Sequence, residues 1–351
     1  MTTKLRIAVI GAGLIGRRHI ALVHENPNCC LAAVVDAHLD AAQTAAEYSA
    51  PFYTDALAML ESVKIDGAIL ATPTNLHTSI GIACAERGVH LLVEKPIAGT
   101  LAEGQRLVDS AEKHNVHLLV GHHRRHNPLV QKAREIVQSG AIGDLVGVTA
   151  TFALLKPDDY YDVTWRTQPG GGPVLTNLIH DIDNMRFVCG EIESIFAATS
   201  AKVRGFAVED TASVTMKFAN GALGSAFVSN TTPSPWSYEM TSGENPIYPR
   251  QSADCYRFLG TKGALGFPSL EFWTYDEPGK EGWWDPLHRW HAGVGVREAD
   301  ALTEQLNHFC AVMRGEVAPL ITGTDGVRTL AATQAVLESG RGDRPITLGT
   351  Y

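Results

Sequence analysis

The chain has 351 residues, of which 45% are hydrophobic and 19% charged, and its formal net charge at pH 7 is −9. This composition is typical of a globular protein, and the length predicts two domains rather than one core. An acidic chain without a basic block is not expected to bind nucleic acid. No apolar run approaches the length of a membrane span, and no secretory leader fits before the first predicted strand, so we expect no membrane partner.

The six cysteines stand at positions 29, 30, 84, 189, 255 and 310. Their spacing contains no C-x-x-C pair and matches no zinc site. Such cysteines are expected to be reduced thiols, as in a cytoplasmic protein.

The first predicted element is a β-branched apolar strand at residues 5–10, which runs into Gly11-Ala12-Gly13-Leu14-Ile15-Gly16. This G-x-G-x-x-G sequence between a strand and a helix is typical of a dinucleotide site. Gly11 permits the tight turn, Gly13 lets the backbone approach a pyrophosphate, and Gly16 lets the helix pack on the strand.

A second apolar run, residues 31–35, ends in Asp36. A carboxylate at this place accepts both hydroxyls of an adenosine ribose and repels a 2′-phosphate. Ala37 and His38 follow it, where a protein that prefers NADP often has arginine or serine. We therefore predict NAD as the cofactor, with NADP less favoured.

Strands predicted at residues 67–73, 89–93 and 116–120 alternate with helices at 39–48, 56–62, 74–87 and 101–114. This alternation predicts a doubly wound parallel sheet, in which ligands bind outside the carboxyl ends of the strands. The expected cofactor contacts at that edge are Gly11, Gly13, Leu14, Ile15, Gly16, Asp36, Ala71, Thr72, Pro73, Asn75, His77, Glu94, Lys95 and Arg124.

Beyond residue 122 the pattern changes to alternating segments separated by turns. They lie at residues 145–154, 194–203, 211–218, 222–228, 256–260 and 264–267, with helices at 129–139, 174–189, 304–314 and 326–339. The predicted fold class is therefore α/β. An N-terminal Rossmann domain, residues 1–122, precedes a C-terminal α+β domain, residues 123–351, with a large, mostly antiparallel open sheet.

The triplet Glu94-Lys95-Pro96, together with the amino-terminal fingerprint, resembles the Gfo/Idh/MocA family of oxidoreductases over essentially the whole chain. Gly121 to Pro128, Gly170 to Pro173 and Val208 to Thr211 add to the resemblance. It implies that Lys95 lies beside the nicotinamide and the substrate hydroxyl, and that the bond before Pro96 is cis. It also implies a homodimer or homotetramer built through the open face of the second sheet.

Oxidation of a secondary alcohol by NAD needs a group that removes the hydroxyl proton as the hydride leaves carbon. A lysine whose pKa is lowered, or a histidine, can do this near neutral pH. The catalytic candidates are Lys95 and His180. The family's helix reads Asp-x-x-x-His, but this chain has Thr176 in place of the aspartate, so Lys95 is expected to carry more of the proton transfer.

The expected substrate contacts are His123, Arg124, Lys156, Trp165, Arg166, Thr176 and Asn177. The basic side chains in this set are compatible with an anionic substrate, and equally with a polyhydroxylated sugar. No metal site is predicted, because His122, His123 and His126 have no convincing further ligand near them. The aromatic loop at residues 283–291 either caps a pocket or, as we prefer, packs against another subunit.

The sequence thus predicts an NAD-dependent dehydrogenase that acts on a CH–OH group of a small molecule: a secondary hydroxyl, or the matching ketone, of a sugar, cyclitol or related cyclic polyol. One alternative is the dehydrogenation of a cis-dihydrodiol, possibly carboxylated. Other members of the family suggest two more, an NAD-dependent glycosidase and a non-enzymatic dinucleotide sensor.

Overall fold

The computed structural model describes residues 3–349 and divides into two compact units. The first contains residues 3–126 together with residues 300–330, and the second contains residues 127–299 together with residues 331–349. The first unit is therefore not continuous in sequence. The domain boundary between residues 122 and 123 stays a prediction.

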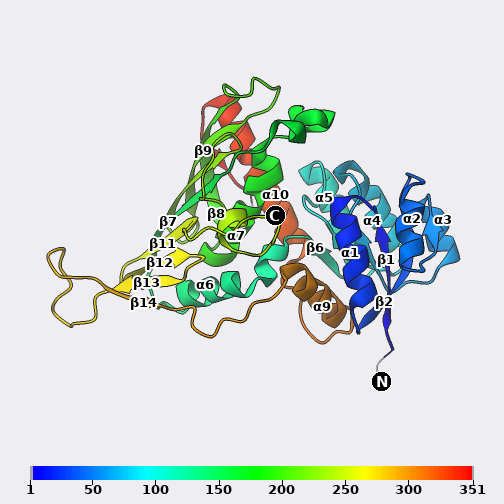
Figure 1. Cartoon of the computed structure of the whole chain (residues 1–351), viewed down its shortest axis with the longest axis horizontal. Coiled ribbons are helices and arrows are strands. Elements are labelled where there is room, and N and C mark those ends of the chain that lie inside the picture. Colours follow the sequence, from blue (N-terminus) through cyan, green and yellow to red (C-terminus); the bar gives the residue numbers. More distant parts are fainter. Residues whose placement is uncertain (1–2, 350–351) are drawn as a thin grey trace. The chain divides into compact units, whose positions relative to one another are not determined.

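A six-stranded parallel sheet forms the first unit, in the order β3-β2-β1-β4-β5-β6. Its strands are β1 (Leu5–Ile10), β2 (Cys29–Val35), β3 (Phe52–Tyr53), β4 (Gly67–Leu70), β5 (His90–Val93) and β6 (Leu118–Val120). Blue to cyan ribbons mark this sheet in Figure 1. The predicted Rossmann sheet is confirmed.

The helices of this unit are α1 (Leu14–Glu25), α2 (Ala41–Glu47), α3 (Ala56–Ser62), η1 (Thr74–Leu76), α4 (His77–Ala85), α5 (Leu101–Lys113), η2 (His123–His126) and α9 (Ala301–Met313). Local sequence explains several ends. Thr100 and Glu103 form a capping box at the start of α5. Leu306 and Phe309 of α9 are buried in the same apolar cluster as Val9 and Ile20, which explains why this late segment belongs to the first unit.

A nine-stranded sheet forms the second unit, in the order β14-β13-β12-β11-β7-β10-β9-β8-β15. Its strands are β7 (Leu145–Ala153), β8 (Ile192–Ser200), β9 (Thr211–Phe218), β10 (Leu223–Ser229), β11 (Tyr256–Gly260), β12 (Gly263–Phe267), β13 (Glu271–Thr274), β14 (His288–His291) and β15 (Ile346–Thr347). The pair β7 and β10 is parallel, and the other pairs are antiparallel, as predicted.

Strands β13, β14 and β15 were not predicted. The segment expected as an aromatic loop is partly strand, because His288–His291 pairs with Glu271–Thr274. Figure 1 shows the loop between these two strands projecting beyond the sheet. Trp283 and Trp284 lie in this loop and are each 85% exposed.

The other helical segments are α6 (Pro128–Gln138), η3 (Asp158–Asp162), η4 (Thr164–Thr167), the π-helical turn η5 (Val174–Leu178), α7 (Ile179–Cys189), α8 (Tyr238–Thr241) and α10 (Gly323–Gly342). Every residue of α7 is buried. The division between the two units falls within α10. Within residues 3–349, no helix combines the length and apolarity needed to cross a membrane.

One face of the second sheet carries large apolar side chains that remain exposed. Trp273 pairs with Ala264, Ala264 with Leu259, Leu259 with Gly147, and Gly147 with Leu223, so these residues form one row across five strands. Leu259 and Leu223 are 40% and 60% exposed. We call this row the open-face stripe.

Candidate active site

The glycine-rich turn has the geometry that its sequence requires. Gly11 has φ of +100°, and a Cβ atom there would lie 2.7 Å from the amide nitrogen of Thr72. A Cβ atom on Gly16 would lie 2.8 Å from the carbonyl carbon of Gly11. At Gly13, in contrast, an added Cβ would meet nothing within 4 Å, so the space beside the start of α1 is open.

Asp36 lies at the end of β2 and faces this turn. Its Oδ2 accepts a hydrogen bond from the amide of Ala12 at 2.7 Å, and its Oδ1 accepts one from the amide of His38 at 2.9 Å. The carboxylate borders a surface cleft of about 450 Å³. The lining residues are Ala12, Gly13, Leu14, Arg17, Asp36, His38, Asp40 and Ala41.

These features fit a dinucleotide. The first turn of α1 has no acidic residue and no side-chain cap, so its amide groups and the positive end of the helix are available to a pyrophosphate. Leu14 is 94% exposed and Ile15 is half-buried at this helix start. The hydroxyl of Thr72 is buried and has no hydrogen-bond partner among the described residues. Asp36 lines the same cleft as Gly13 and Leu14.

The turn after β4 is fixed by the residues around it. The amide of Ala71 donates to the carbonyl of Ile10 at 2.7 Å, and the imidazole of His77 lies 3.0 Å from the carbonyls of Thr72 and Pro96. Burial lowers the pKa of His77, whereas the hydrogen bonds to these two carbonyls act in the opposite direction. His77 therefore links the turn after β4 to the turn after β5, while Pro73 and Asn75 are exposed.

The turn after β5 carries Glu94 and Lys95. Glu94 is 8% exposed, and its Oε1 lies 2.8 Å from Nε2 of His19 in α1. Its other oxygen accepts a hydrogen bond from the amide of Lys95 at 3.2 Å, and a Cβ on Gly121 would lie 2.8 Å from the same oxygen. Burial would raise the pKa of Glu94, but the hydrogen bond and charge of His19, with smaller contributions from His123 and Lys95, lower it overall.

Lys95 follows this anchored carboxylate directly. The peptide bond between Lys95 and Pro96 is cis, as the resemblance implied. Leu70, Val93 and Val120, the last residues of β4, β5 and β6, are in register. The turns that follow these strands therefore reach the same edge of the parallel sheet, and Lys95 is half-buried there.

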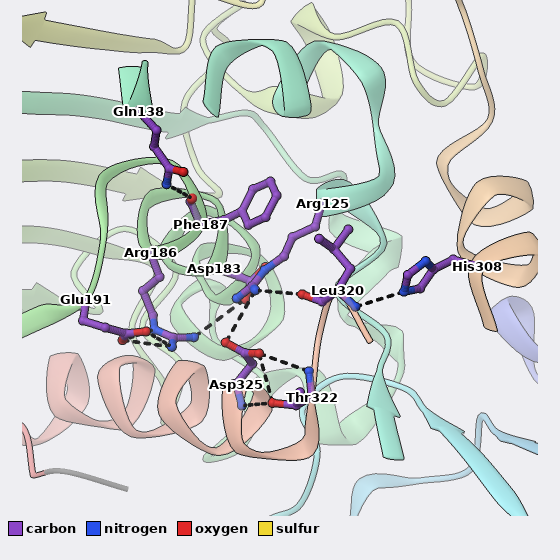
Figure 2. A network of polar contacts seen from close by, with 10 residues as sticks. All are labelled: Arg125, Gln138, Asp183, Arg186, Phe187, Glu191, His308, Leu320, Thr322 and Asp325. Carbon is purple, nitrogen blue, oxygen red and sulfur yellow. Dashed lines mark hydrogen bonds and ion pairs between the residues drawn. The ribbon is translucent and has the colours of Figure 1, made fainter. Parts of the chain in front are cut away.

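Four residues of η2 follow β6. His123 is half-buried, and Arg124 is 4% exposed. Figure 2 shows the next residue, Arg125, with Nη1 lying 3.5 Å from Oδ1 of Asp325 and 3.5 Å from the carbonyl of Leu320. Arg125 is 4% exposed, so it is a buried side chain and not a surface one.

In the second unit, Lys156, Asn177 and Thr176 form a polar cluster. Lys156 is 8% exposed, and its Nζ donates to Oδ1 of Asn177 at 2.7 Å. The Thr176 hydroxyl lies 2.9 Å from the same Oδ1 and 2.9 Å from the carbonyl of Gly172. The structure thus brings together three predicted substrate contacts that are up to 21 positions apart in sequence.

Tyr160 connects this cluster to Arg166. The Nζ of Lys156 lies 4.4 Å from the centre of the Tyr160 ring, and the guanidinium carbon of Arg166 lies 4.0 Å from it. Arg166 also donates to the carbonyl of Tyr160 at 2.7 Å. Trp165 is 53% exposed on its short turn and does not cover the sheet.

The helix that carries His180 begins with the π-helical turn η5. Glu209 accepts a hydrogen bond from the amide of Val174 at 3.0 Å, and a Cβ on Gly172 would clash with the Glu209 carboxylate, lying 2.6 Å from its Oε2 and closer still to its other atoms. Burial raises the pKa of Glu209. His180 itself is 8% exposed at the start of α7.

Asp183, three residues after His180 in α7, lies 4.0 Å from Nη1 of Arg186, which also pairs with Glu191 (Figure 2). In the described part of the chain, no three or more histidine, cysteine or acidic side chains are grouped as metal ligands.

Sequence reasoning did not predict the contacts of three residues that organise these clusters: His19, Tyr160 and Glu209, although Glu209 lies in the stretch Val208 to Thr211 named for the resemblance. For His19 a signal existed, because a histidine lies one helical turn beyond Gly16 on the face that packs against the sheet. For Tyr160 and Glu209, the contacts depend on tertiary structure.

Comparison with known proteins decides the family. Residues 5–122 match the family described as "Oxidoreductase family, NAD-binding Rossmann fold", and residues 130–266 match the "GFO/IDH/MocA C-terminal domain". The chain belongs to the Gfo/Idh/MocA family of oxidoreductases. Its N-terminal part is the NAD-binding Rossmann domain of that family.

The relatives span nearly the whole chain. The uncharacterized oxidoreductase YrbE of Bacillus subtilis is 30% identical, covering 99% of this chain and 98% of the relative. Myo-inositol 2-dehydrogenase of Thermotoga maritima is 28% identical and covers 98% of both chains. The crystal structure of the WlbA dehydrogenase from Bordetella pertussis, in complex with NADH and UDP-GlcNAcA, has a TM-score of 0.80 and is 25% identical over 99% of this chain and 100% of that one.

Proposed function

We propose that this protein is an NAD-dependent dehydrogenase that oxidises a secondary hydroxyl of a sugar, cyclitol or related cyclic polyol, or reduces the matching ketone. The observation that carries the proposal is the placement of Lys95. It follows a buried strand at the carboxyl edge of the Rossmann sheet, beside a carboxylate held by His19 from the dinucleotide-binding helix. A lysine at that edge is suited to act on the reacting oxygen.

Bound NAD supplies the hydride acceptor. Lys95 holds the reacting hydroxyl oxygen by a hydrogen bond, and His180 takes or relays its proton. The substrate is contacted by His123, Arg124, Lys156, Trp165, Arg166, Thr176 and Asn177. Asp36 binds the ribose, which favours NAD over NADP.

The names of relatives support the class of substrate. Members similar over most of their length include myo-inositol 2-dehydrogenase, D-apiose dehydrogenase and scyllo-inositol 2-dehydrogenase. All three act, by name, on cyclic or sugar polyols.

The experiment is an assay of NADH formation across sugars, inositols, sugar acids and aromatic cis-dihydrodiols, with NADP in parallel. We expect turnover with NAD that falls by about a hundredfold or more in Lys95→Ala, because the reacting oxygen loses its partner. A variant that retains wild-type activity would contradict the role of Lys95. Turnover of a dihydrodiol alone would replace the polyol assignment, and hydrolysis of a glycoside without net NADH would indicate a glycosidase. Tight binding of NAD with no chemistry would indicate a sensor.

We further propose a homodimer or homotetramer in the cytoplasm. The open-face stripe supports assembly, because a row of exposed apolar side chains on a flat sheet is suited to contact a second copy. The six cysteines are free thiols, which fits a reducing compartment. Light scattering tests the assembly: Leu223→Lys is expected to lower the measured mass, and an unchanged mass would exclude this face.

A further inference from the structure

The polar cluster of the second unit consists mainly of hydrogen-bond donors. The carbonyl oxygen of Asn177 is occupied by Lys156 Nζ at 2.7 Å and lies 2.9 Å from the Thr176 hydroxyl. The amide nitrogen of Asn177 donates to no other described residue. Because the acceptor end of Asn177 is engaged, this side chain offers donors to a ligand.

Arg166 adds a second unused donor. Its Nη1 donates to the carbonyl of Tyr160 at 2.7 Å, whereas its Nε is buried and has no hydrogen-bond partner among the described residues. A buried donor without a partner is unfavourable, and an acceptor on a ligand removes that cost. The planar guanidinium group matches a carboxylate in particular.

Two cations share one aromatic ring in this cluster. Lys156 Nζ and the guanidinium carbon of Arg166 lie 4.4 and 4.0 Å from the centre of the Tyr160 ring. Both positive charges therefore lie beside one ring, and a bound anion is attracted by both.

The neighbouring charged groups are engaged elsewhere. Arg204 donates to the carbonyls of Lys156 and Asn230 at 2.6 and 3.1 Å and lies 3.3 Å from Asp158. Asp210 accepts hydrogen bonds from the amides of residues 203 and 204, each at 2.9 Å. Arg204 is thus held by the carbonyls of two segments, although its Nε, like that of Arg166, is buried and has no hydrogen-bond partner among the described residues.

We propose that the substrate carries a carboxylate and that Lys156, Arg166 and Asn177 bind it. This inference rests on the proposed function and narrows its substrate class to sugar acids or carboxylated cyclic diols.

The test compares ligands that differ only in the carboxylate. We would measure binding of D-glucuronate against D-glucose, and of D-galacturonate against D-galactose, by calorimetry on the full chain with NADH present. The acid of each pair is expected to bind about tenfold or more tightly, as befits charge-assisted hydrogen bonds. Arg166→Gln should remove most of that preference while changing the Kd of the neutral sugar by less than about threefold.

Two further variants sharpen the comparison. Lys202→Gln removes the same charge from an exposed position in the same unit and should leave both affinities unchanged. Thr176→Asp places a carboxylate beside Asn177 and should also erase the preference for the acid, even if Arg166→Gln fails to fold.

Equal or weaker binding of the acids, absence of binding by either acid, or an equal loss for acid and neutral sugar in Arg166→Gln would overturn the inference. NADH formation is followed in parallel. An acid that binds selectively but is never oxidised supports the inference and contradicts the dehydrogenase. Oxidation of neutral polyols alone, with no preference for acids, contradicts the inference and supports the dehydrogenase.

Discussion

Replacing His19 by alanine leaves the buried Glu94 carboxylate of the first unit without its histidine partner. His19 is 1% exposed and Glu94 8%, and the two side chains are joined at 2.8 Å. Loss of its hydrogen-bond partner costs a buried polar group about 1–3 kcal/mol, and more when the group is charged. The amide of Lys95 remains 3.2 Å from the carboxylate, so we expect a loss of about 3 kcal/mol near neutral pH.

The loss should depend on pH. In the wild type the pKa of Glu94 lies below its ordinary value of 4.5 because His19 outweighs burial. The depressed pKa means that the pair stabilises the fold above that ordinary value and ceases to do so as pH falls through the folded-state pKa. Without His19, burial raises the pKa of Glu94. The carboxyl group is then protonated more readily in the folded state, so the loss of stability in the variant becomes smaller at low pH.

Urea unfolding followed by far-ultraviolet circular dichroism, which reports the helices of the first unit, at about pH 7.5 and about pH 5 tests this. The difference in unfolding free energy between wild type and His19→Ala should fall by about 1 kcal/mol or more at the lower pH. The double variant His19→Ala with Glu94→Gln should be more stable than His19→Ala alone near neutral pH, because it has no buried carboxylate that lacks its partner. A difference that does not change with pH, or a double variant no more stable than the single one, would refute the reasoning.

Two other substitutions test the two units separately. Asp36→Ser removes the carboxylate that accepts a hydrogen bond from the amide of Ala12 at 2.7 Å. We expect kcat/KM with NAD to fall by about tenfold and kcat/KM with NADP to rise, as measured by steady-state kinetics with both cofactors. An unchanged ratio of the two values would contradict the role of Asp36. Gly172→Ala drives a Cβ into the Glu209 carboxylate that anchors Val174, and should cost about 1–3 kcal/mol in denaturant unfolding, whereas Glu209→Gln keeps an acceptor and should cost less.

Local patterns predicted much of the fold. The strand, glycine turn and helix at residues 5–25 follow from β-branched residues, backbone freedom and periodicity within a short window, and their bounds in the structure agree closely. The cis peptide bond before Pro96 was predicted from the resemblance to the family and not from the local sequence pattern. Strands β13 and β15 were not predicted, because each is short and is stabilised by pairing with a neighbouring strand.

The candidate site was harder to predict in detail. His19 and Glu94 are separated by 75 positions, and no local pattern pairs them. The helical spacing assumed between Thr176 and His180 does not allow for the π-helical turn at Val174–Leu178, which changes the angle between successive side chains. The return of residues 300–330 to the first unit likewise depends on the burial of Phe309, which periodicity alone does not locate.

Hydride transfer is tested most directly with a substrate from the panel that carries deuterium on the carbon bearing the reacting hydroxyl. The predicted result is one labelled NADH for each oxidised substrate, with deuterium at the nicotinamide C4, and loss of that label transfer in Lys95→Ala. Turnover without labelled NADH, or unlabelled NADH from the labelled substrate, would contradict a dehydrogenase acting at that carbon.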